Sequence, residues 1–149
     1  MESPYVLQIA SAGDVDDWMN MVDIVKDNFP GFILDEYKKI LEQNIARKTA
    51  LCVKYIDQIV GVLLFSIHGK CLSCMAVHPL HRKKGIGSAL VGKMITMFPN
   101  DIDIWVSTFR EEDKLGEAPR ALYKKFGFVE DELTVEFGYP NQKFVLRRL

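Results

Sequence analysis

The sequence predicts an α/β (α+β) protein with a mixed, largely antiparallel sheet of about seven strands and helices on both faces. The hydrophobic periodicity follows the order strand, two helices, three strands, helix, strand, helix, two strands. Residues 50–77 hold three strand-like runs joined by short turns, which is typical of an antiparallel meander. A glycine-containing loop then leads from the third run directly into an amphipathic helix.

The composition is that of a globular domain. The chain has 149 residues, 48% hydrophobic and 26% charged, so we expect a single domain over residues 1–149 with a substantial core. The net charge is −1 and Lys and Arg cluster only at 82–84, which argues against a nucleic-acid partner. The start lacks the pattern of a signal peptide, and the longest apolar run, 59–65, is too short to span a membrane. We therefore expect a cytoplasmic protein without a membrane partner.

The chain contains three cysteines, Cys52, Cys71 and Cys74. An odd number in a chain without secretory features argues against a disulfide framework. The pair Cys71-x-x-Cys74, followed by His78 and His81, would also suit a zinc site. Residues three apart on a strand point to opposite faces, so we favour small side chains packed in a strand and expect no metal.

The first part of the chain predicts one strand and two helices. Residues 5–10 alternate as a strand does, and Ser11 or Asp14 can cap the helix that follows. The apolar stripe of that helix is Val15, Trp18, Val22, Val25 and Phe29. A second helix is expected over 34–47. The linker 29–32 is aromatic and contains both Pro and Gly, which suits a packed turn.

The meander consists of strands at 50–55, 59–66 and 71–77, with a tight turn expected at Asp57-Gln58. The second strand is almost continuously apolar and should be buried on both faces. Next come the helix from Ile86, a turn at 99–101, a strand at 102–107, a charged loop at 110–117, and a helix from about Pro119 to Gly127. A strand from Phe128, a turn at Pro140-Asn141 and a strand at 144–146 complete the chain.

Residues 75–90 predict an anion site. The strand ends at Val77, Pro79 interrupts it, and basic residues 82–84 precede Gly85 and Gly87 at the helix start. A helix start offers unpaired N–H groups and a partial positive charge, and the glycines allow close approach by a pyrophosphate. A Rossmann dinucleotide site fits less well, because the preceding strand belongs to a meander and the loop lacks the third glycine.

Two motifs carry a resemblance to a known family. Val77-His78-Pro79 followed by Arg82-x-x-Gly85-x-Gly87-Ser88-x-Leu90 resembles the acyl-CoA signature of the GNAT N-acetyltransferase superfamily. The block 121–128, ALYKKFGF, is similar to the late helix of that family, with its tyrosine and its Gly-Phe exit into a strand. The resemblance implies a GNAT-like fold, acetyl-CoA as co-substrate and acetyl transfer to an amine. It also implies an alternative for the linker 29–32, a segment that overhangs the acceptor site instead of a packed turn.

The resemblance also implies roles for particular residues. The pyrophosphate would be held by Arg82, Lys83, Lys84, Gly85, Ile86, Gly87 and Ser88, and the thioester would be oriented by Met75, Ala76 and Val77. A strand bulge near the latter group would free backbone N–H groups for the cofactor arm and the oxyanion. Tyr123 is the candidate general acid, with packing against the cofactor as the alternative. Many relatives carry an asparagine where this chain has Gly116, so one cofactor contact is expected to be absent.

The general base and the acceptor stay open at this stage. The carboxylate and imidazole candidates for the base are Asp103, Glu111, Glu136 and His68, and bulk water is a further alternative. Acidic residues within 111–117 suit either a rim that attracts a cationic amine or a solvated loop. We expect a small-molecule amine as the acceptor, with a peptide amine as the alternative. A homodimer is also possible from the resemblance. A non-catalytic acyl-CoA-binding sensor or regulatory module is the rival function.

Overall fold

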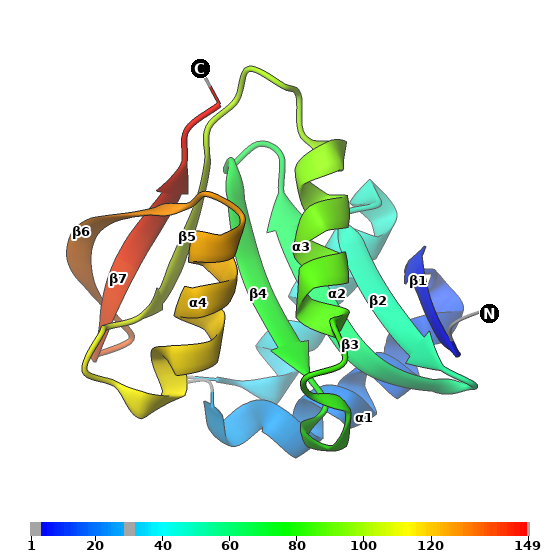
Figure 1. Ribbon diagram of the computed structural model, residues 1–149. Helices are drawn as coiled ribbons and strands as arrows, with labels where there is room; N and C mark the ends of the chain where they lie inside the picture. The colour runs from blue at the N-terminus through cyan, green and yellow to red at the C-terminus, as the bar shows by residue number, and fades with distance from the viewer. Residues whose placement is uncertain (1–3, 29–31, 149) are drawn as a thin grey trace.

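A computed structural model describes residues 4–28 and 32–148. Within these residues seven strands form one open sheet in the order β1-β2-β3-β4-β5-β7-β6, and four α-helices cover it (Figure 1). All neighbouring strands are antiparallel except β4 and β5, which are parallel. This architecture confirms the predicted fold class.

The element order also agrees with the predicted one. The strands are β1 Tyr5–Ile9, β2 Ala50–Tyr55, β3 Gln58–Ser66, β4 Cys71–Val77, β5 Ile104–Phe109, β6 Val129–Glu136 and β7 Tyr139–Leu146. The α-helices are α1 Val15–Val25, α2 Leu34–Arg47, α3 Ile86–Met97 and α4 Glu117–Lys125. Short 3-10 turns occupy Ala12–Asp14, Lys26–Asn28, Pro79–His81 and Lys114–Gly116. The predicted linker 29–32 lies outside the described residues except for Phe32.

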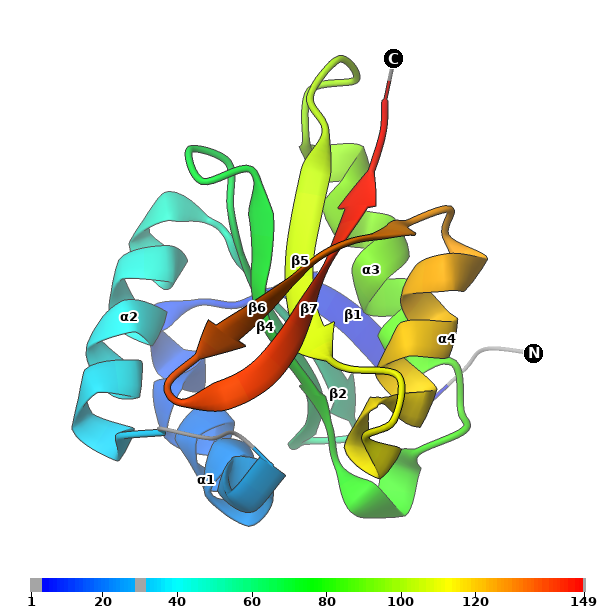
Figure 2. The ribbon, with the colours of Figure 1, turned by 90° about the vertical axis from the view of Figure 1, so that its left-hand side faces the viewer.

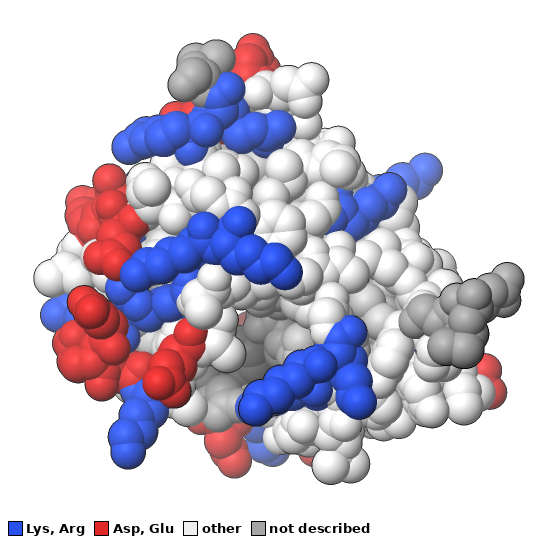
Figure 3. Space-filling view, in the orientation of Figure 1, with Lys and Arg blue, Asp and Glu red and all other residues white. Residues whose placement is uncertain are grey.

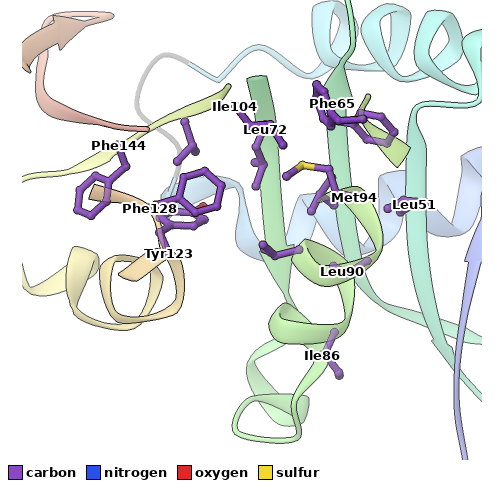
Figure 4. Packing of buried hydrophobic residues seen from close by; sticks show 14 of the residues in the cluster. Leu51, Phe65, Leu72, Ile86, Leu90, Met94, Ile104, Tyr123, Phe128 and Phe144 are labelled. Carbon is purple, nitrogen blue, oxygen red and sulfur yellow. The ribbon is translucent and has the colours of Figure 1, made fainter. Parts of the chain in front are cut away.

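The sheet separates two hydrophobic cores. Helices α1 and α2 cover one face, and α3 and α4 cover the other (Figures 1 and 2). Strand β3 serves both, because Val62 and Leu64 pack with α1 and α2 while Leu63 and Phe65 pack with α3. The prediction that this strand is buried on both faces is confirmed, since its residues from Ile59 to Phe65 are buried. Figure 4 shows the core on the face covered by α3 and α4, where Leu90 and Met94 lie over the strands.

Strand β5 begins two residues later than predicted and extends to Phe109. Its alternation was predicted correctly, since Ile104 and Val106 are buried in the α3/α4 core. Asp103 precedes the strand, and its carboxylate accepts a hydrogen bond from the backbone N–H of Arg148 (2.8 Å). This contact joins the start of β5 to the end of the chain.

The predicted turn at Pro140-Asn141 is wrong. The β6–β7 turn is Phe137-Gly138, with φ angles of 52° and 74°, which is the backbone of a two-residue hairpin turn. Strand β7 therefore begins at Tyr139 instead of residue 144, and Pro140 pairs with Val135. Proline is tolerated there because the pairing of β7 with β5 begins only at Asn141. The turn between β2 and β3 is likewise displaced by one residue, to 56–57, with Ile56 at a φ of 57°.

The pairing between β4 and β5 is short. Only Cys71 with Trp105 and Leu72 with Val106 are in register, after which the two strands diverge. A bulge in β4 marks the same point: Leu72 pairs with Phe65 of β3 and Cys74 with Leu64, so Ser73 is the extra residue. The family resemblance predicted a bulge close to this position. The divergence opens the sheet between its two central strands.

The first turn of α3 lies directly on β3. A Cβ atom built on Gly61 would stand only 2.4 Å from Cγ2 of Ile86 and 3.3 Å from Cδ1 of Leu90. Ile86 is the first residue of α3 and is buried. The absence of a side chain at Gly61 therefore determines how closely the start of α3 approaches the sheet.

We predict that Gly61→Ala lowers the free energy of unfolding by about 1–3 kcal/mol, because the added methyl overpacks the contact with α3. Gly92→Ala is the matched control, because its Cβ would meet the Phe126 ring at 3.6 Å, an ordinary contact, within α3 itself. The control should be neutral or slightly stabilising. Urea unfolding measures both variants, and equal midpoints for the two would contradict this account of the packing.

Candidate active site

The gap between β4 and β5 leaves one edge of β4 open. In the described part of the chain, β4 has no ladder partner on its β5 side after Leu72. Met75 and Val77 contact the core under α3 and α4, while Ala76 contacts the core under α1 and α2. Backbone N–H and C=O groups of this segment can therefore pair with an extended ligand that enters the gap.

The N-terminus of α3 lies at the end of β4 and presents free backbone donors. Gly85, at the N-cap, has a φ of 81°, and no side chain caps the helix. The N–H groups of Ile86, Gly87 and Ser88 belong to the first turn and have no intrahelical acceptors. The basic residues predicted for this loop, Arg82, Lys83 and Lys84, are all exposed. This geometry suits an anion such as a pyrophosphate.

Helix α4 faces this helix start across the open part of the sheet. Nζ of Lys125 donates a hydrogen bond to Oγ of Ser88 (3.1 Å), and a Cβ on Gly87 would meet Cδ2 of Leu122 at 3.0 Å. Figure 3 shows a hollow on this face, between α4 and the loop before α3, with blue Lys and Arg side chains on either side of it. Red Asp and Glu side chains also lie beside the hollow, on its left side in the view of Figure 3, so basic and acidic groups share its border.

Tyr123 of α4 is buried beside the gap. Its side chain is 4% exposed, and its ring lies 5.7 Å from that of Phe128 and 6.2 Å from that of Phe144 (Figure 4). Among the described residues its hydroxyl has no hydrogen-bond partner, so a bound ligand can use it. Burial, followed by the nearby Cys74 sulfur, raises the pKa of Tyr123 well above its usual value. The hydroxyl therefore keeps its proton at neutral pH.

A second polar group reaches Cys74 from the other face of the sheet. Nε1 of Trp18 donates a hydrogen bond to the hydroxyl of Tyr37 (2.9 Å), which lies 3.8 Å from Sγ of Cys74. Burial raises the pKa of the Cys74 thiol to about 11, so the thiol is neutral. Trp18 belongs to the apolar stripe predicted for the first helix, and Tyr37 lies within the second predicted helix, 34–47. Their link to the gap required the tertiary structure, because Cys74 is distant in sequence.

The four candidates for the general base lie in different places. Asp103 and His68 lie at the end of the sheet where β4 and β5 begin, away from the opening. Asp103 is also bound by Arg147 (3.3 Å) and by the backbone of Arg148. Glu111 follows β5 on an exposed loop, and Glu136 ends β6, so these two lie at the open end.

Close packing explains why glycine occupies position 116. A Cβ there would lie 2.9 Å from Cβ of Phe109 and 3.2 Å from Cδ of Arg120, so an asparagine does not fit without rearrangement. Arg120 is buried, and its Nη1 donates to the carbonyl of Phe109 (3.0 Å) and to Oε1 of Gln142 (2.7 Å). The guanidinium thus anchors α4 to β5 and β7, a role that the sequence did not indicate.

Two histidines shape the loop before α3. The backbone N–H of His78 donates to the carbonyl of Val60 (2.8 Å), and its Nδ1 accepts from the N–H of Leu80 (3.1 Å). Nδ1 of His81 lies 3.1 Å from the hydroxyl of Tyr5. Burial, then the neighbouring His81 and Arg82, lower the pKa of His78 below its usual value. The neutral imidazole of His78 is thus part of the loop geometry.

Residues 4–28 and 32–148 contain no group of three or more His, Cys, Asp or Glu side chains that could hold a metal ion. Cys52, Cys71 and Cys74 are free thiols. No helix within the described ranges is both long and apolar enough to cross a membrane.

The family model of the acetyltransferase (GNAT) domain matches residues 46–130, which is more than half of the chain. The chain therefore belongs to the GNAT acetyltransferase family. No curated protein matches it in sequence. The resemblance stated from the two sequence motifs is thereby confirmed.

Solved structures share the fold over nearly the whole chain. A GNAT-family acetyltransferase from Bacillus cereus has a TM-score of 0.75 at 23% identity, covering 97% of this chain and 98% of its own. Naa50 from Arabidopsis thaliana, in complex with the bisubstrate analogue CoA-Ac-MVNAL, has a TM-score of 0.75 at 18% identity, covering 96% and 98%. YncA from Salmonella typhimurium, solved with acetyl-CoA, has a TM-score of 0.72 at 14% identity, covering 99% and 95%.

We predict that His78 makes folding sensitive to mild acid. Because its pKa is lowered in the folded state, the unfolded chain takes up a proton first as the pH falls below about 6.5, and stability decreases. His78→Asn keeps an acceptor for the N–H of Leu80 but cannot gain a proton in this range. Urea unfolding at pH 7.5 and pH 5.5 should show a smaller loss of stability in this variant than in the unmodified protein. An identical loss would assign the effect to other groups.

Proposed function

We propose that the protein transfers the acetyl group of acetyl-CoA directly to a primary amine. The observation that carries this proposal is the gap between β4 and β5, which has a helix start at one end and the free hydroxyl of Tyr123 beside it. The helix start suits the anionic end of a ligand, and the gap suits an extended arm. The hydroxyl of Tyr123 suits a reactive thioester. Acetyl-CoA is such a ligand.

The loop before α3 would hold the pyrophosphate. Backbone N–H groups of residues 85–88 point from an uncapped helix start, and the side chains of Arg82, Lys83 and Lys84 supply positive charge. Ile86 would contribute only its backbone, because its side chain is buried against β3. Ser88 is already oriented by Lys125, whose ammonium group adds a further positive charge.

The open edge of β4 would hold the arm and the reacting group. Met75, Ala76 and Val77 would pair through their backbone with the amides of the pantetheine, as an added strand does. An N–H group freed next to the bulge would stabilise the oxyanion that forms on the thioester carbonyl. Such positioning alone is worth on the order of 7–11 kcal/mol in the best cases.

The transfer makes one C–N bond, breaks one C–S bond and moves one proton to the leaving sulfur. The neutral amine attacks the carbonyl carbon, so the C–N bond forms, and collapse of the tetrahedral intermediate breaks the C–S bond. The departing sulfur takes the proton of the Tyr123 hydroxyl, and the nitrogen releases its surplus proton to water. The raised pKa of Tyr123 supports this role, because the group is protonated when the thiolate leaves. The phenolate then regains a proton from solvent.

The acceptor proposed from the sequence is a small-molecule primary amine. A peptide amine is the second candidate, because Naa50 is solved with a peptide-containing analogue and a further similar structure is the ribosomal-protein-S18-alanine N-acetyltransferase of Escherichia coli. A cytoplasmic location and a homodimer remain predictions from the sequence. Binding of acetyl-CoA without turnover on any amine would instead favour the sensor or regulatory module.

A thermal-shift titration tests the loop assignment. Acetyl-CoA at 100 times its dissociation constant should stabilise the protein by about 2.7 kcal/mol, a shift of several degrees. Gly87→Leu should abolish this shift, because the side chain fills the helix start near Leu122. Ala89→Leu, at an exposed position in the same helix, is the control and should retain the shift. No shift with the unmodified protein at millimolar acetyl-CoA would overturn the proposed function.

Tyr123→Phe tests the general acid. The variant should lower kcat by about 10²-fold or more, because thiolate departure loses its proton donor, while the affinity for acetyl-CoA stays unchanged. Thiol release measures the first quantity and thermal shift the second. In the unmodified protein kcat should not fall between pH 7 and pH 9 through ionisation of this tyrosine, because its pKa is raised. A variant with unchanged kcat would reduce Tyr123 to a packing role.

A further inference from the structure

The carboxylate of Glu136 is held by two neutral donors. Oγ of Ser107 on β5 and Nδ2 of Asn141 on β7 (2.9 Å) both donate to the same oxygen, Oε2. In the described part of the chain, the other oxygen, Oε1, has neither a hydrogen bond nor an ion pair. The side chain is partly buried, so Oε1 is oriented by the protein and open to a ligand.

Glu136 differs in this respect from other carboxylates on its strand. Glu130 pairs with Nζ of Lys124 (2.9 Å) and with Nη2 of Arg120 (3.1 Å), and Asp131 lies 3.8 Å from Arg147. No Lys or Arg among the described residues pairs with Glu136. Arg110 lies near but donates instead to the carbonyls of Asn141 (3.1 Å) and Thr134 (2.9 Å). The carboxylate is therefore oriented without being paired to a cationic side chain, and this arrangement favours a cationic ligand.

The carboxylate lies where the sheet opens. Ser107 is the first residue of β5 beyond its last pairing with β4, Val106 with Leu72. Because Ile104 and Val106 point into the α3/α4 core, Ser107 and the carboxylate bound to it lie on the opposite face. Figure 2 shows the end of β6 turned toward the side of the sheet that carries α2. Glu136 and the pyrophosphate loop thus lie on opposite faces at the same gap.

Two aromatic rings lie close to the backbone position of Glu136. Tyr139 is the register partner of Glu136, and its ring lies 5.8 Å from that of Phe109 in an edge-on arrangement. The hydroxyl of Tyr139 is bound by Asp113, which holds the ring in place. An alkyl chain next to an ammonium group would find apolar contact here, and the ring faces attract positive charge.

We propose that Oε1 of Glu136 binds the ammonium group of the acceptor and places its nitrogen at the gap between β4 and β5. This assignment rests on the proposed function and adds that the acceptor is a primary amine that arrives protonated. The bound ammonium loses one proton to water before its nitrogen attacks. Glu136 is thus a binding and positioning residue, with acetyl-CoA approaching from the opposite face.

The test begins with a panel of primary alkylamines and of peptides with free N-termini, assayed by thiol release with the unmodified protein. With the best acceptor, Glu136→Gln should raise the KM for the amine about 10-fold or more. The amide oxygen would stay with the donors Ser107 and Asn141, so an NH2 group, which cannot accept a hydrogen bond, would replace Oε1. The thermal shift with acetyl-CoA should be unchanged. Glu132→Gln, which removes the same charge from an exposed position on the same strand, is the control and should leave KM unaltered.

The outcomes separate the two proposals. Turnover by the unmodified protein with an unchanged KM in Glu136→Gln would overturn the assignment of Glu136 alone. An equal rise of KM in Glu132→Gln would also overturn it, since the effect would then come from overall charge. A thermal shift with acetyl-CoA but no turnover on any amine would overturn the proposed direct transfer, and this assignment with it.

Discussion

The short pairing between β4 and β5 is the constraint on which the rest of the structure depends. Two residue pairs join these central strands, and beyond them the sheet is open between its helical layers. The Ser73 bulge changes the pairing of β4 with β3 at the same point. An unpaired central strand edge would normally be costly, because buried backbone groups need partners. Under the proposed function the amides of acetyl-CoA would supply those partners, and the gap in the sheet would be its binding site.

The two helices beside the gap are positioned by close contacts on the sheet. Gly61 lets the first turn of α3 approach β3, which places the uncapped N–H groups at the end of β4. Arg120 ties α4 to β5 and β7 and thereby places Tyr123 on the other side of the gap. Gly116 leaves room for that guanidinium. Packing at Gly61, Gly116 and Arg120 therefore determines how the basic loop and Tyr123 lie relative to each other across the gap.

Charge is distributed so that the two faces of the gap differ. Basic side chains border the hollow on the α3/α4 face (Figure 3), whereas the opposite face presents the oriented carboxylate of Glu136. An anionic co-substrate and a cationic acceptor would thus be directed to separate entrances and meet where the strands part. The net charge of −1 averages over both regions and reveals neither.

Periodicity and glycine positions are local properties of the chain, so they were enough to predict the element order, the two-sided burial of β3 and the glycine loop at the start of α3. The sequence misplaced the β6–β7 turn, because proline is typical of turns. Pro140 can lie in β7 because the pairing of β7 with β5 begins only at the next residue. The sequence also could not rank Asp103, His68, Glu111 and Glu136, because strand direction decides which end of the sheet each one occupies. Only the tertiary structure brought Ser107, Asn141 and Glu136 together, and Trp18 and Tyr37 to Cys74, because these contacts join segments that sequence spacing does not relate.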